Sequence, residues 1–316
     1  MTDLYIGMDG GGTRTTAVLV RSDGRILRRA EGRGMNWLND GLEACTERFR
    51  DLIRQLLPGD PGVTVKVCAG CAALDGPAPD GILDAFRAVL PSGTRLMLTS
   101  DLSAALAGLT RGRPGLMAVC GTGSMVLIRN RKGEEKAAGG WGRRIGDPGS
   151  GAMLAREALF TGLYLAETEG KRVPLLEAAL RFFGGSRPRD LPEAVHAPGL
   201  GQDAIAAFGR EVILLAENGD PEARSILERQ MSLLAGPAAF LLEEAPEAKE
   251  SIGVYGGVFQ HSALARELFS EALGARIPGL RIRLPQDPPA LGAVLLGMLE
   301  DGLQTEELPE MKEEKP

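Results

Sequence analysis

Met8-Asp9-Gly10-Gly11-Gly12-Thr13-Arg14-Thr15 lies between residues 3–9 and 14–21, two strand-like runs rich in isoleucine, valine, leucine and threonine. Consecutive glycines let the backbone adopt positive φ and let its N–H groups approach a phosphate. Thr13 adds a hydroxyl donor, and Asp9 adds a carboxylate able to hold a hydrated Mg²⁺. Because Asp-Gly is also a hairpin signal, this loop by itself leaves a simple turn and a phosphate site equally open.

Two further glycine turns end strand-like runs. Gly121-Thr122-Gly123-Ser124 follows the run 116–120, and Gly253-Val-Tyr-Gly256-Gly257 closes a strand ahead of a helix near Ser262. Each could be only a tight turn, but their joint placement predicts a nucleotide held by two domains. The Gly-x4-Gly-Lys-Ser/Thr and Gly-x-Gly-x-x-Gly patterns are absent from the first loop, which opens into a strand, so P-loop and Rossmann sites are excluded.

Length and charge limit the class of protein. A chain of 316 residues exceeds the usual single core and predicts two domains. Its net charge of -6 argues against binding to nucleic acid or to an anionic membrane surface and favours a small soluble partner. No apolar run reaches about 18 residues and no signal peptide is visible, so a cytoplasmic location is expected. The four cysteines are predicted to be reduced.

The first half of the chain predicts a βββαβαβα order. Strands are expected at 3–9, 14–21, 25–31, 63–69 and 95–100, and helices from Asn39 or Asp40 to Pro58-Gly59, at 78–90 and from Asp101 to Leu109. The first helix is indicated by apolar residues at helical spacing.

Arg111-Gly112-Arg113-Pro114-Gly115 breaks this order and marks a boundary. After it the strand meander restarts, so the two halves are interpreted as structural repeats. Residues 150–245 are predicted to be mostly helical, residues 251–303 return to alternating strands and helices, and 304–316 form a charged, flexible tail.

Asp101 is a candidate catalytic base. It follows the apolar strand that ends at Thr99-Ser100, so its carboxylate could lie at the mouth of a sheet. A phosphoryl acceptor needs such a carboxylate to orient its hydroxyl and take the proton. The alternative role is an N-cap, and both roles are compatible.

The loop 139–151 is too rich in glycine for a strand or helix and contains Trp141 and Asp147. An aromatic face beside a carboxylate suits a sugar ring, and a long structureless loop favours function over a surface loop with a packed tryptophan. Asn36 is a weaker candidate. Cys68-Ala-Gly-Cys71 could be a redox or metal pair, but small buried residues are the favoured interpretation.

These motifs together resemble the N-acetylglucosamine kinases and their relatives among the BadF/BadG/BcrA/BcrD-type ATPases, in the superfamily of actin and the sugar kinases. The resemblance spans residues 3–300. It is carried by Asp9-Gly-Gly-Gly-Thr13, Asn36, Ala69-Gly70, Thr99-Ser-Asp101, Gly121-Thr-Gly-Ser124, Gly139-Gly-Trp-Gly142, Gly146-Asp147 and Gly256-Gly257. The ordered set is far more specific than any one motif.

The resemblance implies an α/β fold of two ribonuclease-H-like, actin-like ATPase domains with ATP and Mg²⁺ in a central cleft and the sugar deeper in it. The first domain would comprise residues 1–113 with 289–303, and the second residues 114–288 with a helical insertion. Residues 304–316 would be a flexible tail. A homodimer is a further implication.

Roles for single residues follow from the same resemblance. Asp101 would be the base, and Asp9 would help to hold the metal. The nucleotide would be bound by Gly11, Gly12, Thr13, Thr122, Gly123, Ala207, Gly256 and Gly257. The amino sugar would be bound by Asn36, Asp101, Ser124, Gly140, Trp141, Gly142 and Asp147.

Two departures leave the choice of sugar open. The family often reads Gly-Asp-Glu-Gly-Ser where this chain has Pro148 in Gly146-Asp-Pro-Gly-Ser150. Met125 stands where animal members carry asparagine, which removes an amide that could bond to the sugar.

The implied activity is phosphorylation of N-acetylglucosamine or a related amino sugar by ATP, at O6. Glucosamine, N-acetylmuramic acid and glucose are alternative substrates. A second class is an iron–sulphur activator of acyl-CoA dehydratases or reductases, motivated by Cys68, Cys71 and Cys120. A third is a sugar-sensing regulator without catalysis, against which the intact Asp101 argues.

Overall fold

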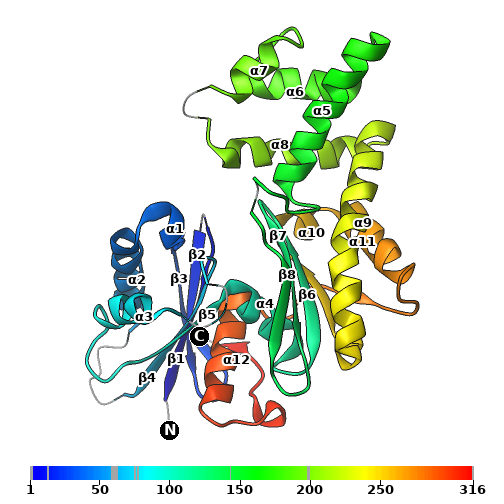
Figure 1. The fold of residues 1–316 in the computed structure, drawn as a ribbon. Helices are drawn as coiled ribbons and strands as arrows, with labels where there is room; N and C mark the ends of the chain where they lie inside the picture. Colours follow the sequence, from blue (N-terminus) through cyan, green and yellow to red (C-terminus); the bar gives the residue numbers. More distant parts are fainter. Residues whose placement is uncertain are drawn as a thin grey trace. The chain divides into compact units, whose positions relative to one another are not determined.

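The chain forms two compact units. The computed structural model describes residues 3–12, 14–57, 63–74, 76, 78–142, 144–197 and 200–314, so Thr13 and Pro58-Gly59 lie outside the described residues. The N-terminal unit comprises Met1–Gly115, Asn130–Gly133 and Pro285–Pro316, and the C-terminal unit comprises Leu116–Arg129 and Glu134–Leu284 (Figure 1).

The N-terminal unit is built on a sheet with the strand order β11-β3-β2-β1-β4-β5. Its strands are β1 Leu4–Gly10, β2 Arg14–Arg21, β3 Arg25–Arg33, β4 Val65–Cys71, β5 Arg95–Ser100 and β11 Lys312–Glu313. Its helices are α1 Trp37–Asp40, α2 Leu42–Leu56, α3 Asp80–Arg87, α4 Asp101–Thr110 and α12 Pro289–Glu300, with a 3-10 turn, η2, at Thr305–Glu307. The first three strands are antiparallel, and β4 and β5 continue parallel to β1.

Helices cover both faces of this sheet (Figure 1). Alternation along β1 sends Ile6 to a core shared with Phe49 of α2 and Phe86 of α3, and sends Tyr5 to the opposite core, which contains Val294 of α12. The unit is therefore a three-layer sandwich, with the carboxyl ends of β1, β4 and β5 at one edge.

Helix α12 approaches its neighbours at backbone distance. A Cβ added at Gly292 would lie 1.9 Å from the carbonyl oxygen of Ala104 in α4, and one added at Gly7 in β1 would lie 2.0 Å from the carbonyl oxygen of Ala290. Only glycine fits at either position without moving backbone. This contact fixes α4, and with it the start of that helix at Asp101.

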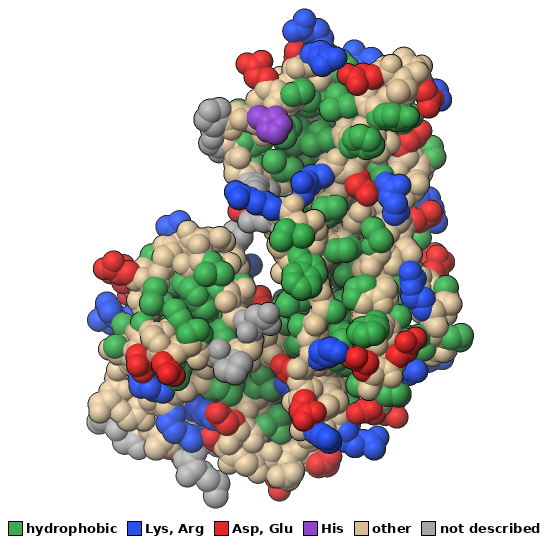
Figure 2. All heavy atoms as spheres, in the orientation of Figure 1, with side chains coloured by type: hydrophobic (Ala, Val, Ile, Leu, Met, Phe, Trp, Pro, Cys, Tyr) green, Lys and Arg blue, Asp and Glu red, His purple; other side chains and the backbone are tan. Residues whose placement is uncertain are grey.

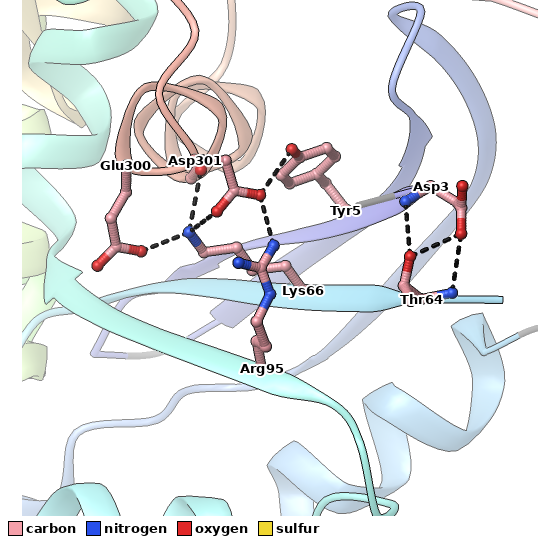
Figure 3. A network of polar contacts seen from close by, with 8 residues as sticks. Asp3, Tyr5, Thr64, Lys66, Arg95, Glu300 and Asp301 are labelled. Atoms are coloured by element: carbon pink, nitrogen blue, oxygen red, sulfur yellow. Dashed lines mark hydrogen bonds and ion pairs between the residues drawn. The ribbon is translucent and has the colours of Figure 1, made fainter. Parts of the chain in front are cut away.

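A polar network secures the end of α12 (Figure 3). The Lys66 ammonium, 4% exposed, donates to Asp301 at 2.7 Å and to the Gly297 carbonyl at 3.0 Å, and it pairs with Glu300. Tyr5 donates to the Asp301 carboxylate at 2.9 Å. Burial acts to lower the pKa of Lys66, but the hydrogen bonds that it donates to Asp301 and Glu300 outweigh this effect and raise that pKa. The ammonium also complements the negative end of the α12 dipole.

The C-terminal unit repeats the first sheet and adds helices. Its strands are β6 Gly115–Cys120, β7 Ser124–Arg129, β8 Glu135–Gly139, β9 Ile252–Tyr255 and β10 Ile282–Arg283, in the order β10-β9-β6-β7-β8. Its helices are α5 Gly151–Glu169, α6 Pro174–Phe183, α7 Asp190–Val195, α8 Gln202–Glu217, α9 Pro221–Glu244, α10 Gly257–His261 and α11 Ala263–Gly274, with a 3-10 turn, η1, at Pro246–Glu250.

The order β3-β2-β1-β4-β5 matches β8-β7-β6-β9-β10, with β4 parallel to β1 and β9 parallel to β6. The predicted structural repeat and the α/β, ribonuclease-H-like fold of both halves are confirmed. The helical stretch expected at 150–245 is also present, as α5 to α9.

Three local predictions were wrong. Helix α2 starts after Gly41, and Asn36 caps the additional short helix α1 by accepting from the Leu38 N–H at 3.1 Å. The N-cap of α4 is Ser100, so Asp101 is its first helical residue. In the predicted flexible tail, residues 312–313 pair with β3 and Leu308 is buried. Short segments with isolated apolar residues among charges give no periodic signal.

The surface mixes charges of both signs. Figure 2 shows basic and acidic side chains interspersed on the face drawn. Among the described helices, none is long and apolar enough to cross a bilayer.

We predict that Lys66→Met lowers the free energy of unfolding by about 3 kcal/mol, because it leaves Asp301 buried without its ammonium partner. Urea unfolding followed by circular dichroism measures this loss. Arg87→Met is the control, since it breaks an exposed pair with Asp84 and should cost less than about 1 kcal/mol. Equal losses in the two variants would contradict a structural role for the network.

Candidate active site

Asp9 and Asp101 meet at the carboxyl edge of the first sheet. Asp9 lies beside Gly70 of β4, and Gly70 lies beside Thr99 of β5, two residues before Asp101. A Cβ added at Gly70 would lie 3.3 Å from the Asp101 Cα, so α4 starts directly against β4. The sheet thus brings together two carboxylates that are far apart in sequence.

Burial sets the electrostatics of this pair. Desolvation, followed by repulsion from Asp101, raises the pKa of Asp9 to about 7. Desolvation raises the pKa of Asp101 to about 6, against hydrogen bonds from the backbone N–H groups of Leu102 and Asp101. A divalent cation would relieve both effects, so the donor set fits Mg²⁺.

The first glycine loop lies next to this pair. Met35 donates its N–H to the Gly11 carbonyl at 3.1 Å, which places Asn36 beside the end of β1. The Asn36 side-chain oxygen serves as the cap of α1, leaving its amide group as the part to offer a ligand. Gly12 is exposed, and a Cβ there would meet nothing within 4 Å.

The second and third glycine turns lie side by side in the C-terminal unit. They follow β6 and β9, which are parallel neighbours. Gly256 has φ of +92°, and a Cβ on it would lie 2.5 Å from the Cys120 carbonyl oxygen. Thr122 is exposed on the adjacent turn. Thr122, Gly123, Gly256 and Gly257 thus form one cluster.

Helix α8 approaches the same cluster. A Cβ on Gly151 would lie 2.7 Å from the Ala206 carbonyl oxygen and 3.5 Å from that of Gly121. Ala207, the next residue, is exposed. Its predicted place near the nucleotide turns is compatible with this contact.

Asp147 holds the backbone of the loop 139–151, here called the tryptophan loop. This carboxylate, 3% exposed, accepts the Gly142 N–H at 3.0 Å, and the Gly140 N–H bonds to the Ser124 carbonyl at 3.0 Å. Trp141 is 70% exposed. The loop therefore presents an aromatic face from a fixed backbone.

Asp147 also lies against the second glycine turn, since a Cβ on Gly123 would lie 2.8 Å from its Oδ2 atom. The structure thus brings together the residues predicted for the sugar in this unit, which are Ser124, Gly140, Trp141, Gly142 and Asp147.

Sequence reasoning missed one polar residue of this region. Gln230 of α9 is 1% exposed and accepts the Gly149 N–H at 2.8 Å. Gln230 lies in a long helix with no glycine or acidic motif near it, so no sequence pattern indicates a functional role. Only the packing of α9 against the loop reveals it.

Cys68 and Cys71 do not form the pair that their spacing could suggest. Cys68 and Cys71 are on the same strand but belong to cores on opposite faces of the sheet. Burial raises the pKa of each of these thiols to about 12. The described residues contain no group of three or more His, Cys, Asp or Glu side chains arranged for a metal. A Mg²⁺ would therefore take its remaining ligands from water and phosphate.

A family model agrees with the geometry. Residues 6–297 match the model described as the BadF/BadG/BcrA/BcrD ATPase family. An N-acetylmuramic acid/N-acetylglucosamine kinase from Clostridium acetobutylicum is 26% identical over 301 residues, with 93% of this chain and 98% of that protein covered. The N-acetyl-D-glucosamine kinase of Dictyostelium discoideum is 24% identical over 314 residues, covering 94% and 98%.

Solved structures share the fold. A protein from Chromobacterium violaceum, provisionally assigned as an N-acetylglucosamine kinase, superposes with a TM-score of 0.75 at 28% identity, covering 93% of this chain and 99% of that one. A ROK family glucokinase from Streptomyces griseus, in complex with glucose and AMPPNP, has a TM-score of 0.59 at 19% identity, covering 95% and 100%.

We predict that Asp9→Asn raises the melting temperature at pH 8 by several degrees in the absence of Mg²⁺. Because the pKa of Asp9 in the folded protein, about 7, is above its ordinary value of 3.8, the folded state holds an extra proton between these values and loses stability as pH rises through them. The asparagine variant avoids this loss, so its advantage should shrink at pH 5.

Thermal unfolding with and without millimolar MgCl₂ measures both the pH effect and metal binding. MgCl₂ should stabilise the wild type at pH 8 more than it stabilises Asp9→Asn. The exposed Asp51→Asn is the control and should leave both responses unchanged. If the wild type and Asp9→Asn respond equally to pH and to Mg²⁺, the assignment of Asp9 to the metal site is wrong.

Proposed function

The chain belongs to the BadF/BadG/BcrA/BcrD ATPase family, and from this premise we propose that it is an ATP-dependent kinase of N-acetylglucosamine or a closely related amino sugar. The observation that carries the proposal is the half-buried pair of Asp9 and Asp101, both with raised pKa values, at the carboxyl edge of parallel strands. Two relatives that match this chain over nearly their full length are named as amino-sugar kinases, and their names support the substrate class.

Asp101 is proposed as the base. A pKa of about 6 leaves the carboxylate ionised in most molecules at neutral pH while keeping it able to take a proton from a sugar hydroxyl. The backbone N–H groups of Leu102 and Asp101 at the start of α4 act to lower this pKa and so favour the ionised carboxylate. The oxygen that loses its proton is proposed to be O6. It attacks the γ-phosphorus of ATP, and the bond from that phosphorus to the bridging oxygen breaks so that ADP leaves.

Asp9 is proposed to hold the metal through bound water. Mg²⁺ when bound supplies positive charge to the phosphates and to the transferring phosphoryl group. The backbone of Gly11 and Gly12 is proposed to contact phosphate, as is Thr13, which lies outside the described residues. Phosphoryl transfer requires this positioning more than any covalent contribution from the protein.

The C-terminal unit is proposed to bind both ligands. Thr122 and Gly123 would contact phosphates, and Gly256, Gly257 and Ala207 would flank the adenosine. The exposed Trp141 offers an apolar face to a sugar ring, and the buried Asp147 offers acceptors for hydroxyl groups. Asn36 would add an amide from the N-terminal unit.

Two alternatives are less well supported. An iron–sulphur activator would need cysteines that can share a cluster, but Cys68 and Cys71 point to opposite faces of their sheet. A sugar-sensing regulator would not need Asp101 as a base. Glucosamine, N-acetylmuramic acid and glucose are retained as alternative substrates. Action as a cytoplasmic homodimer with Mg²⁺ rests on the family resemblance.

The activity is tested by measuring ADP release with ATP and MgCl₂ across glucose, glucosamine, N-acetylglucosamine and N-acetylmuramic acid, with a control that lacks sugar. We expect N-acetylglucosamine to stimulate release most strongly. Product analysis by NMR should place the phosphate at O6. ADP release that no sugar stimulates would overturn the proposal.

We further predict that Asp101→Asn lowers kcat by about a thousandfold, because the amide cannot accept the hydroxyl proton. Sugar affinity, measured by isothermal titration calorimetry, should change little. In the wild type kcat/KM should fall as pH drops below about 6, the pKa of Asp101. The matched control is Asp80→Asn, an exposed aspartate at the start of α3, and near-normal turnover of Asp101→Asn would exclude the proposed base.

A further inference from the structure

A cavity of about 460 Å³ lies within the C-terminal unit. It opens between strands β7 and β8, the tryptophan loop, the start of α5 and one side of α9. Its walls are mostly apolar, formed by Met125, Ala137, Ala138, Gly139, Trp141, Gly146, Pro148, Met153, Leu233, Leu234 and Pro237. Two polar side chains, Ser124 and Gln230, also line it.

These two side chains carry polar atoms that have no partner in the protein. The Ser124 Oγ and Gln230 Nε2 atoms are the buried side-chain nitrogen or oxygen atoms found without a hydrogen bond among the described residues. Both residues are more than nine-tenths buried. An unpaired buried polar group costs about 1 to 3 kcal/mol, so the arrangement favours a ligand that supplies the missing partners.

The orientation of the Gln230 amide is set by the protein. Its Oε1 atom accepts the Gly149 N–H at 2.8 Å, so the remaining group must be the NH₂ donor. Ser124 adds a hydroxyl that can accept or donate. The cavity therefore offers one fixed donor and one adaptable partner inside apolar walls.

This combination matches a secondary amide that carries an alkyl group. The carbonyl oxygen of such an amide would accept from Gln230, its N–H would donate to Ser124, and its alkyl carbons would lie against Met125, Met153 and Leu234. A sugar ring carries hydroxyl groups on most of its carbons, and these would lack partners against such walls.

We propose that this cavity binds the 2-acylamino group of the sugar substrate and that Gln230 is the residue that selects N-acylated over free amino sugars. The inference rests on the proposed kinase function. Of the two polar groups, Gln230 comes from α9, outside all the glycine motifs.

The size of the cavity has a second consequence. It falls within the range of about 300 to 1,000 Å³ that accommodates whole small ligands, so an acetyl group does not fill it. Longer acyl chains would bury additional methylene groups, each worth about 0.8 kcal/mol, or roughly fourfold in affinity. The chain should therefore accept N-propanoyl- and N-butanoylglucosamine at least as well as N-acetylglucosamine.

The test compares glucosamine with its N-acetyl, N-propanoyl and N-butanoyl derivatives, by isothermal titration calorimetry without ATP and by kcat/KM with ATP. In Gln230→Met, affinity and kcat/KM for the N-acyl sugars should fall about tenfold, the loss of one good hydrogen bond, while the values for glucosamine stay unchanged. Ser124→Ala should give a smaller loss of the same selectivity, and it breaks no hydrogen bond within the protein.

A variant that narrows the cavity provides a check on its size. Leu234→Phe should reduce affinity for N-butanoylglucosamine more than for N-acetylglucosamine. Gln55→Met, at an exposed glutamine of α2, is the matched control for loss of an amide, and melting temperatures confirm that each variant is folded.

The outcomes separate this inference from the proposed function. Equal affinity for glucosamine and its N-acyl derivatives, or an unchanged preference in Gln230→Met, would overturn the assignment of the cavity even if the enzyme is active. Because binding is read without turnover, a selective loss in Gln230→Met would support the assignment even if no sugar is phosphorylated. In that case only the kinase activity would be rejected.

Discussion

The packing of α12 against β1 and α4 is the contact on which the N-terminal unit depends. At Gly7 and Gly292 the backbones approach so closely that a single added Cβ would collide with a carbonyl oxygen. The Lys66–Asp301 pair then fixes the far end of α12 with hydrogen bonds made inside the protein. Because α4 begins at Asp101, the same contact determines where the proposed base lies relative to Asp9.

The half-buried aspartates Asp9 and Asp101 oppose folding when both are ionised, but they supply the carboxylates that the proposed chemistry needs. Desolvation raises both pKa values, so the ligand-free protein keeps two carboxylates in an environment that opposes their charge. A bound cation would remove part of this cost, and a sugar hydroxyl would give Asp101 a hydrogen-bond partner. Two single atoms, Ser124 Oγ and Gln230 Nε2, present a similar cost, because each is buried without a hydrogen-bond partner among the described residues. The aspartate pair and the cavity thus both contain polar groups that a bound ligand could stabilise.

Much of the architecture could be predicted because its signals are local. Alternating apolar residues identify β1 and β2, and the helical spacing of Cys45, Phe49, Leu52 and Leu56 identifies α2. The short helix α1 and the pairing of residues 312–313 with β3 could not be predicted in this way. Each depends on one capping bond or on two ladder positions, which leave no repeating pattern in the sequence.

The sequence by itself determined the α/β fold class, the repeat of two strand meanders, the glycine turns after their strands and the family to which the chain belongs. These features follow from side-chain period, backbone freedom at glycine and the order of motifs. Only the tertiary structure decided that Asp101 raises the pKa of Asp9 and that Cys68 and Cys71 face different cores. It also decided that Gln230, whose amide nitrogen is buried and unpaired, lines a cavity. These properties depend on desolvation and contact between residues far apart in the chain, which packing alone can create.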